Sequence, residues 1–559
     1  MLRHRAVRLA HHVVVALVLM GPVASLAAVP DPPAGNGPWI VRAHFQSKSQ
    51  VDRLAAEKEP WEVHYDKGYL VVDVDRAGWQ MLLDLGFEPE VDEALTAEVL
   101  RPHVRLPGQI SAIPGFPCYR TVEETFAAAQ AIVTAHPTLA SWVDIGDSWE
   151  KQQAGAPPGY DMMVLRLTNS AVPGPKPKLL VNAAIHAREY ATAELVMRFA
   201  ESLANGYGTD PDITWILDNQ EVHLVLQANP DGRKKAELGA FWRKNTDPFT
   251  CGDPNNWGTD LNRNYPYNWG CCGGSTTNSC GETFRGQAAA SEPEVQAVRD
   301  YILANFPDYG PPSPPDAAGL FLDIHSYSEL VLWPWGYTGT PAPNATALQT
   351  LGRKFAYFNG YYPEQSIGLY VTDGTTIDYA YGQQGVSAYT FELGTAFFQD
   401  CNTFLNTILP TNMQALLYAA RITRAPYMLP AGPDALSVIT IPPGSVGSGQ
   451  PLVVNATIND THYSTANGIE PVQTIAAAEV YVDTPPWAPG ATPVALAASD
   501  LAFDETIEPV QGTLLTATWA TGRHTLFVRG RDLANNWGPV GSVFIDVVVP
   551  VELQSFSIE

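Results

Sequence analysis

Three residues that could bind a metal ion follow two largely apolar segments of the chain. His186 and Glu189 come at the end of the run 178–185, and His325 comes at the end of the run 320–324; both runs are typical of buried strands. Two imidazole nitrogens and one carboxylate form the ligand set of many hydrolytic Zn²⁺ sites, and they leave the ion one position for water. Because ligands bind beyond the carboxyl ends of strands in open α/β sheets, the pattern predicts one zinc ion per chain at this edge.

A hydrolytic zinc site also needs a base, a donor for the developing oxyanion and groups that hold the substrate. Glu392 ends another apolar run and is the candidate general base, and Arg243 is the candidate oxyanion donor. Asp260 is the candidate partner for the second ring nitrogen of one histidine. Asn262 and Arg263 offer an amide and a planar guanidinium, which suit binding of a carboxylate. A carboxylate clamp beside a hydrolytic zinc ion predicts an exopeptidase.

Composition describes an acidic globular protein of several domains. The 559 residues are 45% hydrophobic and 16% charged, and 58 acidic residues against 33 basic ones give a net charge of −25. This length favours about three domains. A surface of this charge repels phosphate backbones and anionic lipid, so nucleic acid is not expected as a partner.

The first residues are typical of a bacterial-type export signal. Arg3, Arg5 and Arg8 precede the apolar run 13–20, and small residues follow, so residues 1–27 are predicted to be a signal peptide. The run is shorter than the ~20 residues that span a bilayer. We therefore expect a secreted, extracellular protein with no membrane span after the signal is removed.

The cysteines of an exported chain are expected to form disulfides rather than to bind metal. All of them fall in the middle of the sequence: Cys118, Cys251, Cys271, Cys272, Cys280 and Cys401. Several pairings are compatible with these positions.

Three folded regions are predicted after the signal peptide. Residues 36–105 form a small α+β domain that ends in an exposed, proline-containing linker. Residues 113–427 alternate apolar strands with amphipathic helices, which predicts an α/β fold with a mixed, mostly parallel sheet and helices on both faces. Residues 430–559 predict an immunoglobulin- or fibronectin-like β-sandwich and a tail, with no assigned partner. Strands of the sandwich are expected at 451–458, 478–483, 514–519, 524–530 and 542–549.

The middle region resembles zinc metallocarboxypeptidases of the pancreatic carboxypeptidase A/B and bacterial carboxypeptidase T type. Five motifs carry the resemblance, in the order and spacing of that family: NPDG at 229–232, WRK at 242–244, DLNRNY at 260–265, CGETFRG at 280–286 and HSYSELVLWPWGY at 325–337.

Carried over position by position, the resemblance implies zinc on His186, Glu189 and His325. It implies Glu392 as the general base and Arg243 as the oxyanion donor. Substrate, the C-terminus of a peptide or protein, would be bound by five residues, the first three holding its terminal carboxylate: Asn262, Arg263, Tyr370, Arg188 and Tyr327.

The same resemblance implies a pocket for the C-terminal side chain with Ile377 at its floor, where relatives that prefer basic residues carry an acid. An apolar or aromatic C-terminal residue is therefore expected. Asp373 is a nearby acid, so a pocket that accepts basic as well as apolar C-terminal residues remains an alternative. The pocket lining implied by the resemblance is Leu332, Gly336, Leu369, Thr372, Thr375, Ile377 and Thr390.

The flanks and cysteines extend the resemblance. The N-terminal domain has the size and pattern of the family's propeptide, which implies a zymogen that an activating protease cleaves, with Arg105-Leu106 as the expected site. Cys280 matches a disulfide cysteine of the family; Cys251 is its favoured mate, and Cys271 or Cys272 could compete. The vicinal cysteines and the C-terminal sandwich depart from the pancreatic pattern.

Two other functions remain open. One is a zinc amidohydrolase that acts on cell-wall peptides, because related folds share the zinc ligands and differ in the pocket. The other is a non-catalytic surface-binding protein in which the sandwich is the active part. Retention of Glu392 and all three ligands argues against the second.

Overall fold

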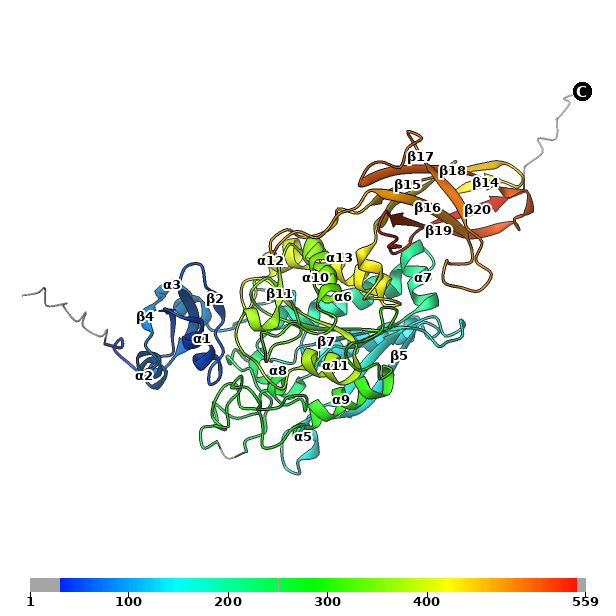
Figure 1. Ribbon diagram of the computed structural model, residues 1–559. Coiled ribbons are helices and arrows are strands. Elements are labelled where there is room, and N and C mark those ends of the chain that lie inside the picture. The colour runs from blue at the N-terminus through cyan, green and yellow to red at the C-terminus, as the bar shows by residue number, and fades with distance from the viewer. Residues whose placement is uncertain (1–30, 250, 550–559) are drawn as a thin grey trace, which may run out of the picture.

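The computed structural model describes residues 31–249 and 251–549 (Figure 1). The predicted signal peptide, 1–27, and the predicted tail that begins at residue 551 lie outside the described residues. Within the part that is described, none of the helices combines the length and the apolar character needed to cross a membrane.

The N-terminal domain is a small antiparallel sheet, in the strand order β2-β3-β1-β4, with helices packed against it. Its core contains Val41, Leu54, Val72 and Leu82. The elements are β1 (Trp39–His44), α1 (Lys48–Ala55), β2 (Glu62–His64), β3 (Tyr69–Val74), α2 (Arg76–Asp84), β4 (Glu88–Val91) and α3 (Glu93–Val99). Helix α3 is not predicted by the sequence pattern; it begins where the Asp92 carboxylate accepts a hydrogen bond from the Leu95 N–H.

The middle domain is built on one eight-stranded sheet in the order β11-β10-β12-β9-β7-β8-β6-β5. Four of its seven pairings are parallel and three are antiparallel, so the sheet is mixed, with its parallel strands at the centre. The strands are β5 (Ala140–Asp147), β6 (Asp161–Leu167), β7 (Lys178–Ala183), β8 (Glu221–Val225), β9 (Leu320–His325), β10 (Leu330–Trp333), β11 (Tyr362–Gln365) and β12 (Ser387–Glu392).

Helices cover both faces of this sheet, as expected for central strands that are buried on both sides (Figure 1). One layer contains α4 (Val122–Ala135), α6 (Tyr190–Gly206), α7 (Pro211–Asn219), α10 (Ala345–Asn359) and α13 (Leu409–Ile422); the other contains α9 (Pro293–Asn305) and α11 (Thr376–Gln384). The short helices α5 (Trp149–Gln152), α8 (Pro230–Glu237) and α12 (Cys401–Thr403) lie in the connections.

The C-terminal domain is all-β and encloses its own apolar core. Strand β17 pairs with both β16 and β18, which joins the strands in the order β13-β15-β18-β17-β16-β19-β20-β14. The strands are β13 (Asp434–Ile441), β14 (Ser445–Gly447), β15 (Pro451–Asn459), β16 (Ile475–Val482), β17 (Val494–Ala498), β18 (Ile507–Leu515), β19 (Gly522–Asp532) and β20 (Gly541–Val548).

The strand predicted at 514–519 is wrong. Strand β18 ends at Leu515, and Thr516–Thr518 form a single 3₁₀ turn. The Thr516 hydroxyl donates a hydrogen bond of 2.7 Å to the carbonyl of Gln450, which belongs to a distant turn. This long-range contact overrides the local strand pattern.

A buried lysine joins the middle and C-terminal domains. Lys354 of α10 is fully buried, and its Nζ lies 3.0 Å from Oδ2 of Asp434 and 4.3 Å from the centre of the Tyr463 ring. The same Asp434 oxygen lies 3.0 Å from Nδ1 of His462. Beside this contact, Nη1 of Arg353 lies 2.7 Å from the Glu470 carboxylate. The C-terminal domain is therefore packed on α10 through ion pairs that are shielded from water.

Replacing Lys354 with Met should destabilise the protein by about 3–5 kcal/mol, because it leaves the Asp434 carboxylate buried without its lysine. Equilibrium unfolding in urea would measure the loss. Adding Asp434→Asn to this variant should recover part of it. The matched control is Lys151→Met, since Lys151 forms a half-exposed pair with Asp147 and should cost at most about 1 kcal/mol. Equal losses in the two single variants would contradict the prediction.

Candidate active site

The predicted site residues meet at one edge of the central sheet. Strands β7, β9 and β12 are parallel neighbours, so their carboxyl ends lie side by side. His325 is the last residue of β9 and Glu392 the last of β12, and the two are paired in register. His186 follows β7, and Glu189 stands at the start of α6.

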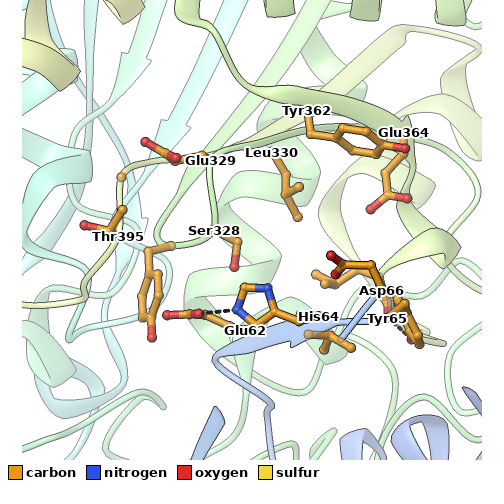
Figure 2. A pocket seen from close by; sticks show the side chains of 14 residues that line it. Glu62, His64, Tyr65, Asp66, Ser328, Glu329, Leu330, Tyr362, Glu364 and Thr395 are labelled. Carbon is orange, nitrogen blue, oxygen red and sulfur yellow. Dashed lines mark hydrogen bonds and ion pairs between the residues drawn. The ribbon is translucent and has the colours of Figure 1, made fainter. Parts of the chain in front are cut away.

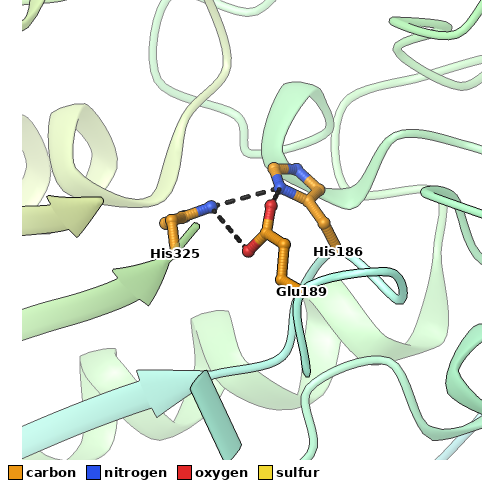
Figure 3. A group of neighbouring side chains, drawn as sticks. All are labelled: His186, Glu189 and His325. Carbon is orange, nitrogen blue, oxygen red and sulfur yellow. Dashed lines mark hydrogen bonds and ion pairs between the residues drawn. The ribbon is translucent and has the colours of Figure 1, made fainter. Parts of the chain in front are cut away.

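His186, Glu189 and His325 turn their ligand atoms toward one point (Figure 3). One ligand atom from each residue lies within 4.8 Å of the others. Nδ1 of His186 lies 2.7 Å from Glu189 Oε1 and 3.1 Å from Nδ1 of His325. All three side chains are buried. Two converging imidazole nitrogens and a carboxylate fit a Zn²⁺ ion, which prefers this mixture of nitrogen and oxygen ligands.

Each histidine has a carboxylate behind it. Nε2 of His186 lies 3.3 Å from Oδ1 of Asp260, and Nε2 of His325 lies 3.0 Å from Oδ2 of Asp323. An acceptor at Nε2 favours the tautomer that carries its proton there and leaves Nδ1 free for a metal ion. Asp260 is expected from the sequence. Asp323 is not, although an acid inside an otherwise apolar strand is a signal that could have found it.

The charge of Glu189 is compensated by the two histidines. Burial disfavours ionisation of this carboxyl, but His186 and His325 outweigh it and hold the pKa of Glu189 at about 2. Glu392 is in the opposite situation. Its burial dominates, and the negative Glu189 and Glu59 add to it, so that the pKa of Glu392 rises to about 8 despite the opposing His325 and Arg243. The site therefore holds one carboxylate that stays ionised and one that binds a proton readily.

Two arginines of the site are held by carboxylates. Arg243 donates from Nε and Nη2 to Oδ2 of Asp260, at 3.1 and 2.9 Å, and from Nη1 to Glu59. Arg188 donates to Glu59 at 2.7 Å and to Glu282 at 2.6 Å. Neither Glu59 nor Glu282 is expected from the sequence as a site residue. Glu59 belongs to the N-terminal domain, so a residue of that domain reaches the predicted oxyanion donor.

Most predicted residues line one small cavity of about 40 Å³. It brings the two candidate histidine ligands together with the predicted base, oxyanion donor, carboxylate clamp and pocket floor. Its lining is Glu59, His186, Arg243, Asn262, Arg263, His325, Leu332, Ser366, Leu369, Tyr370, Thr372, Thr375, Ile377, Thr390 and Glu392.

Four of the predicted residues are not part of this lining: Glu189, Arg188, Tyr327 and Gly336. Arg188 stacks on Phe397 and Phe241, with its guanidinium carbon 4.2 and 4.5 Å from the ring centres. Tyr327 packs edge-on against Phe397 at 4.8 Å. Gly336 lies behind the wall, where a Cβ atom would come within 2.2 Å of the Thr372 hydroxyl.

The carboxylate of Asp373 does not line the cavity. It is fully buried and accepts hydrogen bonds from the N–H groups of Cys272 and Gly274, at 3.3 and 3.0 Å, and from the Ser275 hydroxyl. These bonds hold the loop that carries the vicinal cysteines, and they occupy both carboxylate oxygens.

A larger cavity of about 600 Å³ lies next to the site, between the N-terminal and middle domains (Figure 2). The β2–β3 hairpin supplies Glu62, His64, Tyr65 and Asp66 to it, and the facing wall includes Glu329 and other residues of the middle domain. None of the predicted metal ligands lines this cavity. The N-terminal domain thus covers the edge of the sheet where the site lies.

All six cysteines form disulfides, as the sequence predicts. The bonds are Cys118–Cys401, Cys251–Cys280 and Cys271–Cys272. The pairing of Cys251 with Cys280 that the resemblance favours is confirmed.

Comparison with known proteins assigns the middle domain to a family. Residues 126–415, more than half of the chain, match the family model described as zinc carboxypeptidase. A zinc carboxypeptidase of Saccharothrix mutabilis subsp. capreolus is 35% identical over 292 residues, which cover 50% of this chain and 62% of that protein. Carboxypeptidase A1 of Rattus norvegicus is 32% identical over 311 residues, which cover 52% of this chain and 66% of the relative. The chain thus matches somewhat less than two thirds of the length of these two proteins.

Solved structures agree with this assignment at the level of the fold. Carboxypeptidase A from Helicoverpa armigera aligns with a TM-score of 0.55 at 22% identity, covering 68% of this chain and 95% of that one. Thrombin-activatable fibrinolysis inhibitor aligns with a TM-score of 0.53 at 20% identity, covering 69% and 98%. Since the family match includes all three candidate metal ligands and Glu392, this chain belongs to the zinc carboxypeptidase family.

Proposed function

We propose that this protein is a secreted zinc carboxypeptidase that removes C-terminal residues from peptides. The observation that carries the proposal is the convergence of a metal-binding group, a proton-binding carboxylate and a carboxylate clamp around one cavity. His186, Glu189 and His325 would hold the ion.

The proposed chemistry divides among the residues of the site. A zinc ion held by these ligands would supply the positive charge that lowers the pKa of a water molecule toward neutral. Glu392 would accept a proton from the attacking water and pass it to the leaving amine, and burial raises its pKa above the usual range of a carboxyl group, which favours the transfer in both directions. Arg243 donates to the oxyanion. Asn262 and Arg263 hold the terminal carboxylate of the substrate, and Tyr370 closes over it.

The character of the pocket favours an apolar or aromatic C-terminal residue. Its wall near the floor consists of Ile377, Leu332 and Thr390, which carry no charge. A basic side chain would need an accessible carboxylate there. Asp373 does not supply one, because its oxygens are occupied by the loop at 272–275.

The position of Glu59 supports synthesis as a zymogen. Its carboxylate accepts hydrogen bonds from Arg188 and Arg243, and the Tyr370 hydroxyl lies 3.5 Å away. A carboxylate in this position competes with substrate for the same donors. The linker that follows the N-terminal domain is accessible to an activating protease: Arg105 is exposed, and Leu106 is 46% exposed.

The purified protein is expected to bind about one Zn²⁺ per chain. His186→Ala or His325→Ala should bring the metal content measured by atomic emission close to zero, because each removes a ligand. His223→Gln is the matched control, since His223 is equally buried but is paired with Glu221 away from the site. A full zinc content in both ligand variants would contradict the proposed metal site.

Blocked dipeptides that end in Phe should be hydrolysed after the linker is cut, and those that end in Arg much more slowly. Glu392→Gln should lower kcat about 10²–10⁴-fold with zinc content unchanged, because it removes the base but no ligand. Release of the terminal amino acid measures both effects. Comparable release of Arg would refute the apolar pocket, and no release from the cleaved, zinc-loaded enzyme would refute the carboxypeptidase and favour cell-wall peptides.

Glu59→Gln should activate the uncleaved chain at least 10-fold, because a neutral amide binds two buried guanidinium groups much more weakly than a carboxylate does. The same dipeptide assay, with the chain shown to be intact by mass, measures it. Glu62→Gln is the matched control: Glu62 lies on the same domain but pairs with His64. Equal activity of Glu59→Gln and the unchanged zymogen would sink the proposed role of Glu59.

A further inference from the structure

We infer that Asp323 is a positioning residue that sets the affinity of the site for zinc through its hold on His325. The inference rests on the proposed function. It adds a residue that the predicted site does not contain, and it concerns metal binding rather than the reaction itself.

Asp323 lies on β9, which has the neighbouring strands β12 and β7 on its two sides. It is paired in register with Asn182 of β7 and with Thr390 of β12, and it is fully buried. Its Oδ1 accepts a hydrogen bond of 2.9 Å from Nδ2 of Asn182, and its Oδ2 accepts one from the Thr376 hydroxyl. The same Oδ2 lies 3.0 Å from Nε2 of His325. Both oxygens are therefore fixed, and one of them faces the histidine.

The charge of Asp323 lacks the compensation that Asp260 has. Asp260 is held by the guanidinium of Arg243 as well as by His186. Among the ion pairs of the described residues, the only partner of Asp323 is His325. A buried carboxylate without a cation is costly. A metal ion held by His325 would supply that positive charge across the imidazole ring, so a bound metal ion and the Asp323 carboxylate would stabilise each other.

The hydrogen bond between His325 and Asp323 also determines which partners the Asn262 amide can have. Because His325 donates its Nε2 proton to Asp323, this nitrogen cannot accept a hydrogen bond from the Asn262 amide, which lies 3.3 Å away. Oδ1 of Asn262 accepts from the N–H of Thr376 at 2.9 Å, which fixes the orientation of the amide. Its Nδ2 protons remain for a substrate carboxylate. Asp323 and Thr376 thus connect the metal ligand to the proposed clamp.

Asp323→Asn separates the charge from the hydrogen bonds. Oδ1 of Asn182 is buried and has no hydrogen-bond partner. If the Asn182 amide turns over, the new amide at 323 can donate to it and still accept from Thr376 and His325. The substitution then removes the negative charge at little cost in geometry. The apo protein should fold, and its affinity for Zn²⁺ should fall about 10–100-fold.

The experiment measures zinc affinity of the full chain by competition with a chromophoric chelator, for the unchanged protein and for Asp323→Asn. The cobalt-substituted forms are compared by their visible absorption bands, which report the ligand field and which a purely structural role would not move. Asp378→Asn is the matched control, because Asp378 is equally buried but accepts from the N–H of Gly336. Its zinc affinity should change less than about twofold.

Each outcome decides the matter. Zinc affinity of Asp323→Asn within twofold of the unchanged protein, with the same cobalt spectrum, would overturn the inference and leave the proposed function intact. Failure of the unchanged protein to bind zinc would instead overturn the proposed function. Asp323→Ser serves as a second variant without the charge, and unfolding of both variants would overturn the inference by assigning Asp323 to the fold.

Discussion

Carboxylates buried at the carboxyl edge of the central sheet require positive charge, and the arrangement of the site follows from this requirement. Glu189 stands at the start of α6, Asp260 directly precedes the turn 261–263 and Asp323 lies in β9, and each is at least 98% buried. Ionised carboxylates in such surroundings are stable only with cations or strong donors. Arg243 meets the need of Asp260 and the two histidines that of Glu189, while Asp323 has only His325 as an ion-pair partner among the described residues. A divalent cation between the histidines adds the charge that this group is built to receive.

In the N-terminal domain the relation is reversed: a carboxylate of this domain pairs with cationic groups of the site. With Glu59 present, the guanidinium groups of Arg188 and Arg243 are paired to a carboxylate of the covering domain. The pairing continues outward, since Lys58 contacts both Glu282 and Asp73, at 3.2 and 2.9 Å. Removing the domain therefore uncovers cationic groups that need another anion. A substrate carboxylate or a developing oxyanion has the required charge, so one arrangement would suit both the proposed zymogen and the proposed active enzyme.

Much of the site could be predicted from the sequence because its residues stand in short motifs at strand ends. His186 and Glu189 are three positions apart, and Asp260, Asn262 and Arg263 are almost consecutive. Glu59 has no such local signal: it lies 129 residues before Arg188 and 184 before Arg243, and only the packing of two domains brings them together. Asp323 is an intermediate case. Its place inside an apolar strand is visible, but its partners Asn182 and Thr376 come from other elements.

The fold shows the same division between local and distant information. Alternating residues predict most strands of the C-terminal domain, but the pattern at 514–519 fails because Thr516 is fixed by a distant carbonyl. The packing of this domain on α10 depends on Lys354, whose sequence position resembles that of any helical lysine.

The C-terminal domain also contacts the strand that precedes the segment 366–375. In the C-terminal domain, Asn467 donates to the Pro363 carbonyl at 2.9 Å, and Pro363 belongs to β11, directly before the segment 366–375 that carries Tyr370 and several pocket residues. Arg353 of α10 donates to the Asn467 carbonyl at 2.6 Å, so Asn467 contacts both α10 and β11. Because rigid supports position binding groups more accurately than free loops do, these contacts would help to fix the base of this segment, although they lie outside the metal group.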